Sequence, residues 1–292
     1  MTTPSTGTAA GLDAFMPPEM AAKAEQIGVA KATMGWRNTL ALGFLAGAFI
    51  ALGAVFANTV TAGAAGKVPF GLVRLAGGTV FCLGLILVVV AGAELFTGNN
   101  LIVMAWANRR ITTRSVLRNW ALVYAGNFIG AVATAVLIFL AGQYKQGGGV
   151  IGFTLLQAAE AKCRLGWVEA VALGMCCNAL VCLAVWLCFS ARTTTDRILS
   201  ILFPITAFVA AGFEHCVANM YIIPSALLVK VGSANAFWEG IGKTPGEYVA
   251  LTWGNFIVHN LVPVTLGNMI GGSVMVGLVY WFVYLRKGLV PR

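Results

Sequence analysis

The sequence contains little charge for a chain of 292 residues. Only 10% of its residues are Asp, Glu, Lys or Arg, whereas a soluble domain is usually about a quarter charged. It also lacks a glycine loop that could cradle phosphate, a nucleophile with a neighbouring base, and a cluster of metal ligands. These absences exclude an ordinary soluble-type active site. We therefore expect no enzymatic activity, no cofactor and no metal site.

Cysteine and histidine are present, but not in spacings that bind a metal or a prosthetic group. The seven cysteines contain no paired CxxC spacing and fall mostly inside apolar runs, so we interpret them as small packing residues. His215 and His259 are the two histidines of the sequence. A membrane redox subunit could use both as haem ligands, but no haem-attachment motif accompanies them. That class stays a remote alternative, and the absence of a Soret band would exclude it.

Long apolar runs dominate what is present. Hydrophobic residues make up 59% of the chain and the mean hydropathy is +0.85. A helix needs about 20 apolar residues to cross a bilayer. The sequence therefore predicts an all-α integral membrane protein with six transmembrane helices, at residues 39–63, 76–107, 116–141, 167–190, 198–229 and 251–285.

Positive charge is confined to the gaps between these runs. The formal net charge of +9 is therefore a topology signal and not a nucleic-acid-binding patch. Eleven Lys and Arg residues fall on the side of the N-terminus and seven on the other side. Because basic residues accumulate on the cytoplasmic side, we expect a multi-pass protein of the cytoplasmic membrane with both termini in the cytoplasm.

Two of the predicted spans are interrupted, and the interruptions match. Residues 91–100 place Gly, Glu and Asn at the same spacing as residues 212–219, namely Gly92, Glu94 and Asn99 against Gly212, Glu214 and Asn219. Polar groups and glycines at membrane depth are tolerated where a broken helix is buried in protein or lines a cavity. We therefore expect the second and fifth helices to be broken at a pore, with the two glutamates and two asparagines supporting the loops.

The matching segments follow the same order in each half of the chain. Residues 126–130 (GNFIG) recur as 267–271 (GNMIG). Three spans per half make the second half enter the membrane from the opposite side, so the halves are inverted repeats, at about 36–141 and 166–287. Such repeats bring broken helices face to face near the midplane. We expect Thr97 and His215 to share one cavity.

The two ends of the chain are assigned separately from the channel domain at 36–287. Residues 1–35 are predicted to form a cytoplasmic tail, disordered to about residue 11, followed by a helix from Pro17 along the membrane face. The last five residues, 288–292, are typical of a protease-site remnant of a purification tag.

Three long motifs carry a resemblance to a known family: residues 92–98 (GAELFTG), 212–220 (GFEHCVANM) and 260–268 (NLVPVTLGN). The chain resembles the formate/nitrite transporter family, and within it the bacterial formate channels. The resemblance implies an aquaporin-like protomer, a homopentamer in the bacterial inner membrane, and one pore per protomer for formate. Nitrite or hydrosulfide channels of the same family are the alternative.

The resemblance also assigns roles to residues. It implies a central pore histidine, His215, with Thr97 as its partner, polar pore positions at Asn178 and Asn268, and Lys162 at a pore mouth. It further implies apolar constrictions formed by Phe81, Leu85, Leu95 and Phe208. The chain departs from the formate channels at Gly98, where they commonly carry a small hydroxyl residue.

The physical chemistry of a small anion supports a polar centre. An isolated buried carboxylate has a solvation cost on the order of tens of kcal/mol, so something must neutralise a crossing formate. Basic residues at a mouth, half-helix dipoles, and a hydrogen bond or a proton from His215 could each do so. The sequence therefore predicts a weak-acid pore that works as a channel or as an anion–proton symporter.

Overall fold

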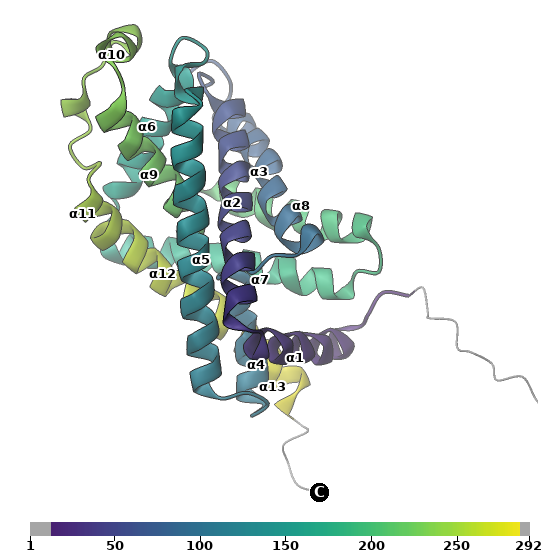
Figure 1. Cartoon of the computed structure of the whole chain (residues 1–292). Coiled ribbons are helices and arrows are strands. Elements are labelled where there is room, and N and C mark those ends of the chain that lie inside the picture. The colour runs from purple at the N-terminus through teal and green to yellow at the C-terminus, as the bar shows by residue number, and fades with distance from the viewer. Residues whose placement is uncertain (1–12, 287–292) are drawn as a thin grey trace, which may run out of the picture.

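The computed structural model describes residues 13–286, and within them it contains helices and no β-strand. The predicted disordered tail at 1–11 and the predicted tag remnant at 288–292 lie outside the described residues. The first element, α1 (Pro17–Thr33), runs across the ends of the long helices α2 (Trp36–Thr61) and α5 (Thr113–Leu140), at the bottom of Figure 1. Glu19 in its first turn accepts a hydrogen bond from the backbone of Met16, which closes the start of the helix.

Within residues 13–286, six helices are long and apolar enough to cross a membrane. They are α2, α3 with its π-helical extension (Phe70–Gly92), α5, α7 (Trp167–Ser190), α8 (Thr194–Ala211) and the last helix (Trp253–Tyr284). The last helix is continuous through α11 (Trp253–Asn255), a π-helical stretch (Phe256–Leu261), α12 (Val262–Met269), a second π-helical stretch (Ile270–Leu278) and α13 (Val279–Tyr284). The prediction of a six-span helical membrane protein is confirmed.

The second span begins earlier than the hydropathy pattern predicts. It starts at Phe70, whereas the prediction was residue 76, and so it includes Arg74. The guanidinium of Arg74 donates hydrogen bonds to the carbonyl oxygens of Val209 and Ala210 at the end of α8. Because these carbonyls form the negative end of the α8 dipole, they accommodate a charge that hydropathy alone counts against a span.

Both predicted helix breaks are present. In the second span, the incoming helix ends at Gly92, and the chain resumes as a short 3₁₀ helix (Gly98–Ile102) and α4 (Val103–Ala107). The second pair consists of α8 and α9 (Cys216–Gly232), separated by residues 212–215. After α9 the chain bends by 110° into α10 (Asn235–Ile241).

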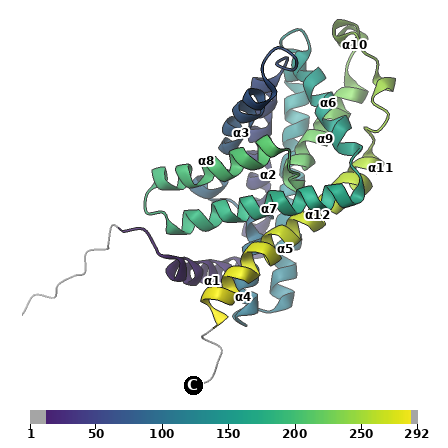
Figure 2. The same cartoon turned by 180° about the vertical axis from the view of Figure 1, so that it is seen from behind.

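The helices pack as two corresponding groups. In the first, α2 lies against α5 and α3, and in the second, α7 lies against α12 and α8. The helices α3 and α8 meet between the groups (Figure 2). Glycine seams hold each group together, since a Cβ at Gly130 would overlap the carbonyl oxygen of Phe44, and one at Gly271 would overlap that of Met175. Only glycine permits this close backbone approach.

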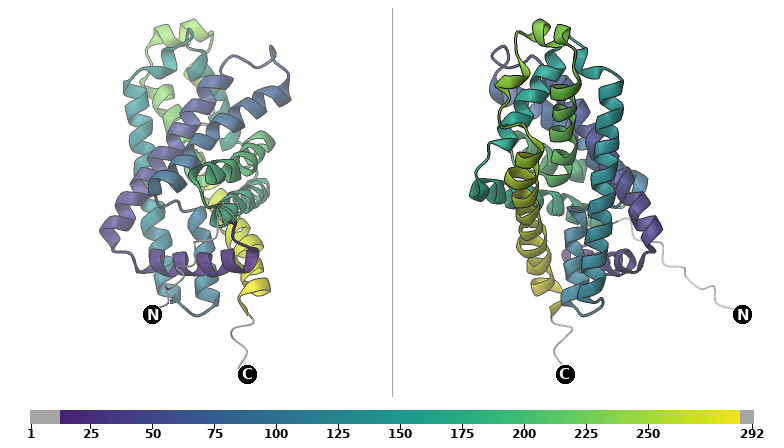
Figure 3. Two further views of the ribbon diagram at one scale, coloured as in Figure 1. Left: turned by 90° about the vertical axis from the view of Figure 1, so that its right-hand side faces the viewer. Right: turned by 60° about the vertical axis from the view of Figure 1, so that its left-hand side comes forward.

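Two further helices occupy opposite ends of the molecule. Whereas α1 packs on the 3₁₀ helix at 98–102 and on α4, α6 (Val150–Cys163) packs on α9 at the far end (Figure 3). Each of the two therefore covers the half-helix that follows one of the breaks. A 3₁₀ turn (Gln143–Lys145) precedes α6, and another (Pro245–Glu247) follows α10.

Candidate functional site

The two breaks form because a glycine ends each incoming helix in a left-handed conformation. Gly92 has φ of +84° and Gly212 has φ of +78°, values that a side chain disfavours. After each glycine the chain is extended, and the amides of Glu94 and Glu214 donate to the carbonyls of Leu42 and Leu173, at 3.2 and 3.3 Å. The sequence match between the loops is therefore a match of backbone hydrogen bonds.

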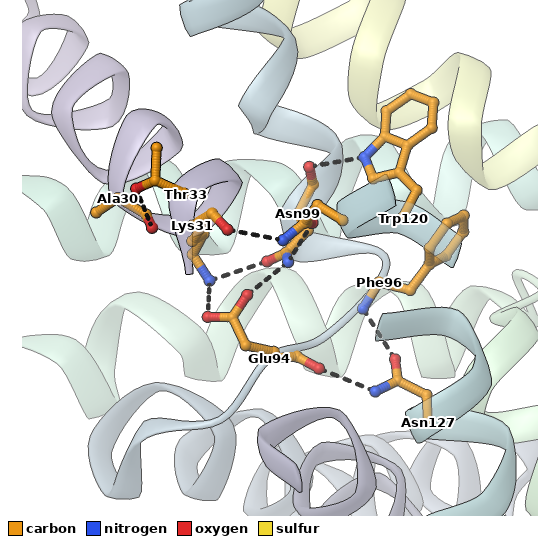
Figure 4. A network of polar contacts seen from close by, with 9 residues as sticks. Ala30, Lys31, Thr33, Glu94, Phe96, Asn99, Trp120 and Asn127 are labelled. Atoms are coloured by element: carbon orange, nitrogen blue, oxygen red, sulfur yellow. Dashed lines mark hydrogen bonds and ion pairs between the residues drawn. The ribbon is translucent and has the colours of Figure 1, made fainter. Parts of the chain in front are cut away.

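An asparagine from the third helix of each group holds the loop in place. The side chain of Asn127 donates to the carbonyls of Gly43 and Glu94 and accepts from the amide of Phe96 (Figure 4). Asn268 donates to the carbonyls of Gly174 and Glu214 and accepts from the amide of Cys216. All six distances lie between 2.8 and 2.9 Å. These bonds satisfy loop amides and carbonyls that water cannot reach.

A lysine from α1 neutralises the first loop glutamate. Lys31 Nζ lies 2.6 Å from Glu94 Oε1 and 2.9 Å from Asn99 Oδ1, as Figure 4 shows. Asn99 Nδ2 donates to Glu94 Oε2 at 2.6 Å and to Asn119 Oδ1 at 3.0 Å, and Asn119 donates to the carbonyl of Lys31 at 3.1 Å. Every charged atom of this buried network has a partner, which is the condition for keeping a charge pair inside a protein.

The second loop glutamate has the same surroundings. Lys162 Nζ lies 2.6 Å from Glu214 Oε1, Asn219 donates to Glu214 Oε2 at 2.7 Å and to Asn260 Oδ1 at 2.7 Å, and Asn260 donates to the carbonyl of Lys162 at 3.1 Å. Two contacts differ: Asn219 Oδ1 has no hydrogen-bond partner among the described residues, and Asn260 Nδ2 also donates to Glu214 Oε2 at 3.2 Å. Lys162 is thus the counterpart of Lys31, and α6 is the counterpart of α1.

Thr97 and His215 meet between the two loops. Thr97 Oγ1 lies 3.0 Å from His215 Nε2, and the two residues are 0% and 3% exposed, respectively. His215 also caps α9, since its Nδ1 accepts the amide of Ala218 at 3.1 Å. A ring nitrogen that accepts carries no proton, so the proton of neutral His215 is on Nε2 and faces Thr97. The positive end of the α9 dipole lies at the same place.

The other predicted polar residue, Asn178, contacts the backbone at this centre. Its Nδ2 donates to the carbonyl of Asn268 at 2.6 Å and to that of Thr97 at 3.3 Å. The thiol of Cys182 also contacts the Thr97 carbonyl, at 3.3 Å. Every hydrogen bond that Asn178 and Asn268 donate goes to a backbone carbonyl, so these side chains position the loops around the centre.

The four predicted constriction residues are buried. The rings of Phe81 and Phe208 meet edge to face at 5.7 Å, and Phe208 stacks on the His215 ring at 5.9 Å. Leu85 and Leu95 line a cavity of about 400 Å³ beneath α1, which we call the vestibule. Its charged lining residues are Lys23, Lys31, Glu94 and Arg197.

Sequence reasoning missed four residues of the two loop networks, Lys31, Asn119, Asn127 and Asn260. Asn127 carried a usable signal, because it stands in the repeated Gly-Asn motif opposite Asn268. Lys31 carried no comparable signal, since its sequence context indicated only a place in an interfacial helix. His259 lies in a π-helical stretch outside both networks.

Six apolar spans and two broken helices that meet at a buried polar centre define a membrane transport protein. The family model described as formate/nitrite transporter matches residues 18–282. The chain is 45% identical to the formate channel FocA of Escherichia coli (strain K12) over 275 residues, which are 94% of this chain and 96% of that protein. It is 44% identical to FocA of Haemophilus influenzae, covering 91% and 93%.

Solved structures agree with the sequence comparison. A pentameric formate channel with formate bound matches at a TM-score of 0.82 and 42% identity, covering 86% of this chain and 98% of that one. An FNT family ion channel matches at a TM-score of 0.72 and 27% identity, covering 91% and 98%. The chain belongs to the formate/nitrite transporter family.

Proposed function

We propose that this protein conducts formate across the cytoplasmic membrane through a pore in each protomer. The observation that carries the proposal is the buried contact of Thr97 with His215, which places hydrogen-bond donors at the meeting point of two broken helices inside an otherwise apolar protein. The identity of 45% with a formate channel and the likeness to a formate-bound structure support formate as the substrate.

The hydrogen bonds around His215 suggest how a carboxylate is accommodated. With Nδ1 accepting from Ala218, the Nε2 proton donates to Thr97 Oγ1, and the Thr97 hydroxyl proton remains available to a substrate oxygen. Protonating His215 at Nδ1 would remove the acceptor of the Ala218 amide. We therefore infer that His215 polarises Thr97 as a hydrogen-bond donor, and that protons crossing with formate arrive on formic acid instead of resting on the ring.

Apolar side chains flank this donor pair. Leu85 and Leu95 line the vestibule, and Phe208 packs against the His215 ring and against Phe81. A neutral acid crosses such slits at much lower cost than its anion, because burying an unpaired carboxylate is unfavourable by several kcal/mol or more. The four residues thus favour a protonated or fully hydrogen-bonded substrate over larger hydrated ions.

A lysine–glutamate pair acts at each mouth of the proposed pore. Lys31 and Lys162 each lie in a part-buried ion pair with the glutamate of one loop. We propose that these pairs hold each loop in the conformation that breaks its helix. The residual positive potential of the lysines attracts anions. Glu94, Glu214, Asn99 and Asn219 are then loop supports, as the sequence analysis expected.

We further propose a homopentamer with both termini in the cytoplasm. Large apolar residues are exposed on the spans, for example Phe203 at 75% and Leu140 at 75%, and they need lipid or neighbouring protomers to cover them. The related structure is described as pentameric, and the excess of basic residues on the α1 side supports a cytoplasmic vestibule.

Uptake into proteoliposomes tests the substrate and the mechanism together. Purified protein is reconstituted, and uptake of formate, nitrite, hydrosulfide and lactate is measured with an internal pH dye. We expect formate to permeate fastest, and His215→Leu to abolish its saturable uptake because neither ring nitrogen is replaced. Leu266→Ala, a change on the exposed side of the last helix, serves as the control. Faster permeation of nitrite or hydrosulfide than of formate would contradict the substrate assignment.

A further variant, His215→Asn, separates hydrogen bonding from proton transfer. His215→Asn can still accept from Ala218 and donate toward Thr97, but it cannot carry a proton at neutral pH. If His215 acts as a donor only, this variant retains formate uptake and its accompanying proton signal. Loss of the proton signal with formate flux preserved would show that the ring itself carries the proton.

A further inference from the structure

The vestibule holds more positive charge than its lining carboxylate balances. Lys23, Lys31 and Arg197 line it, together with Glu94. Lys31 and Glu94 neutralise each other across 2.6 Å. Lys23 and Arg197 are therefore left without a carboxylate partner in the lining of this cavity.

A carbonyl oxygen and an aromatic ring hold Lys23 in place, whereas Arg197 has no such partner among the described residues. Lys23 Nζ donates to the carbonyl of Phe189 at 3.0 Å and lies 4.7 Å from the ring centroid of Phe15. The guanidinium of Arg197, in the first turn of α8, makes no hydrogen bond or ion pair within residues 13–286. The acid beside it in sequence, Asp196, is engaged with the backbone amides of Arg192 and Thr193.

A third cation increases the repulsion. Arg192 donates to the carbonyl of Asp13 at 2.8 Å and stacks over Phe15 at 3.6 Å, so it lies in the turn between α7 and α8 beside Lys23. The pKa of Lys23 is lowered by burial and, next in size, by the charges of Arg197 and Arg192. A bound anion reduces the electrostatic repulsion among cations gathered in this way.

A second part-buried arginine, Arg74, differs from Arg197 because the fold provides its partners. Arg74 is held by the carbonyls of Val209 and Ala210 at the end of α8, where it caps a helix. Its charge is compensated by those dipoles.

The size of the vestibule and the nature of its inner wall determine the kind of anion. About 400 Å³ is far more than formate fills, and Leu85 and Leu95 at the inner wall are apolar. Two cations attract a doubly charged anion more strongly than a singly charged one. The desolvation cost of a dianion is also higher, so it would stop at the leucines.

We propose that Lys23 and Arg197 form a binding site for a small doubly charged oxyanion, of the dicarboxylate or phosphate class, which blocks the pore from the α1 side. The blocking part of this inference rests on the proposed formate transport, while the binding part stands without it. The bound dianion occupies the vestibule next to Leu95 and excludes formate from the slit behind it.

Calorimetric titration of the purified full-length protein with malonate, and separately with inorganic phosphate, tests the binding site in the absence of formate. We expect binding in the wild type and a loss of affinity of about tenfold or more in the double variant Lys23→Gln, Arg197→Gln. The control is Lys67→Gln, Lys145→Gln, which removes the same charge from exposed loops. If only one probe binds, the result identifies whether the site prefers a dicarboxylate or a phosphate.

Several results would overturn the site. They are an absence of binding for both probes, equal affinity in the vestibule variant and the wild type, or acetate binding as tightly as malonate. Arg197→Lys guards against misfolding of the double variant, because it keeps the charge and should keep most of the affinity if the site is electrostatic.

Formate uptake with the dianion on one side tests the block. We expect malonate or phosphate to inhibit uptake from the vestibule face, and the double variant to resist inhibition by about tenfold. Binding without inhibition would overturn the blocking role. Dianion binding that depends on Lys23 and Arg197 in a protein that transports no formate would refute the proposed function and leave the site standing; formate transport without dianion binding would do the reverse.

Discussion

Thr97 Oγ1 lies 3.0 Å from His215 Nε2, although the two residues are 118 positions apart in the chain. Each belongs to a different broken segment, and each segment is held by an asparagine from another helix. The contact therefore depends on both broken segments and on the helices that carry the two asparagines. It also fixes the tautomer of the histidine, because Nδ1 is already used by the amide of Ala218.

Replacing the hydroxyl at this contact gives a direct prediction. Thr97→Val keeps the shape but leaves His215 Nε2 without a partner, which costs about 1–3 kcal/mol. We expect formate flux to fall by about tenfold or more, whereas Thr97→Ser, which retains the hydroxyl, stays within about threefold. Flux is measured by stopped-flow uptake at equal protein density. Equal fluxes in the two variants would remove the hydroxyl from the mechanism.

The ion pair of Lys31 with Glu94 gives a prediction about stability. Lys31→Met leaves a 7%-exposed carboxylate without its cation, and breaking a buried pair costs about 3–5 kcal/mol, less where one partner is part-exposed as here. We expect the melting temperature to fall by about 5 °C or more. Lys162→Met should lower it by a smaller amount, because Lys31 also binds Asn99.

Adding Glu94→Gln to Lys31→Met removes the unpaired charge and should recover part of the loss. Thermal scans of the protein in one detergent provide the measurement. If Lys31→Met melts like the wild type while Lys162→Met does not, α1 does not support the first loop as α6 supports the second.

Gly98 gives a prediction about substitution at a pore position. A Cβ at Gly98 would meet only Val185 Cγ2, at 3.5 Å, which is ordinary contact. Gly98→Ser should therefore fold normally, and its hydroxyl would face the vestibule lining. Gly130→Ser is the matched change at a helix seam, where the new Cβ overlaps the carbonyl of Phe44.

We expect Gly98→Ser to elute as a single oligomeric peak with changed relative permeation of formate and nitrite. Gly130→Ser should aggregate or fail to accumulate, because backbone at a packed seam cannot yield. Size-exclusion chromatography followed by uptake assays checks both. Normal assembly of Gly130→Ser would refute the close approach of α2 and α5.

The lowered pKa of Lys23 predicts a pH dependence for dianion binding. Burial and the charges of Arg197 and Arg192 lower this pKa from the ordinary value of 10.5. The thiol of Cys188, on α7, is the remaining titratable group that acts on it, and in the opposite direction. Lys23 therefore loses its charge at a lower pH than an exposed lysine does. Malonate affinity should weaken as the pH rises toward that of an ordinary lysine.

The variant Lys23→Gln removes this titrating group and should flatten the alkaline decline. Calorimetry from neutral to alkaline pH measures it, with Lys67→Gln as the control. A decline that is the same in Lys23→Gln and the wild type would assign it to another group.

Much of the fold could be predicted from residues that act locally. Gly92 and Gly212 end their helices because each takes a positive φ, and this preference belongs to the residue itself. The order of repeated motifs then implied inverted halves, because an odd number of spans reverses the direction of entry. The start of the second span could not be predicted in the same way, since the tolerance for Arg74 depends on carbonyls that α8 supplies.

The candidate site could be predicted only in part, for the same reason. The sequence identified both loop glutamates and their asparagines, and it placed His215 with Thr97 through the symmetry of the repeats. It did not identify Lys31 or Asn127, although these two residues hold the first loop as Lys162 and Asn268 hold the second.

The sequence by itself determined the class of protein, the number of spans and the two breaks, because apolar run length and glycine conformation are properties of neighbouring residues. The tertiary structure alone decided which cation meets which glutamate, which ring nitrogen of His215 carries the proton, and that Lys23 and Arg197 share one vestibule. These features are set by hydrogen bonds and charge contacts between helices far apart in the chain. Only packing brings such partners within reach of one another.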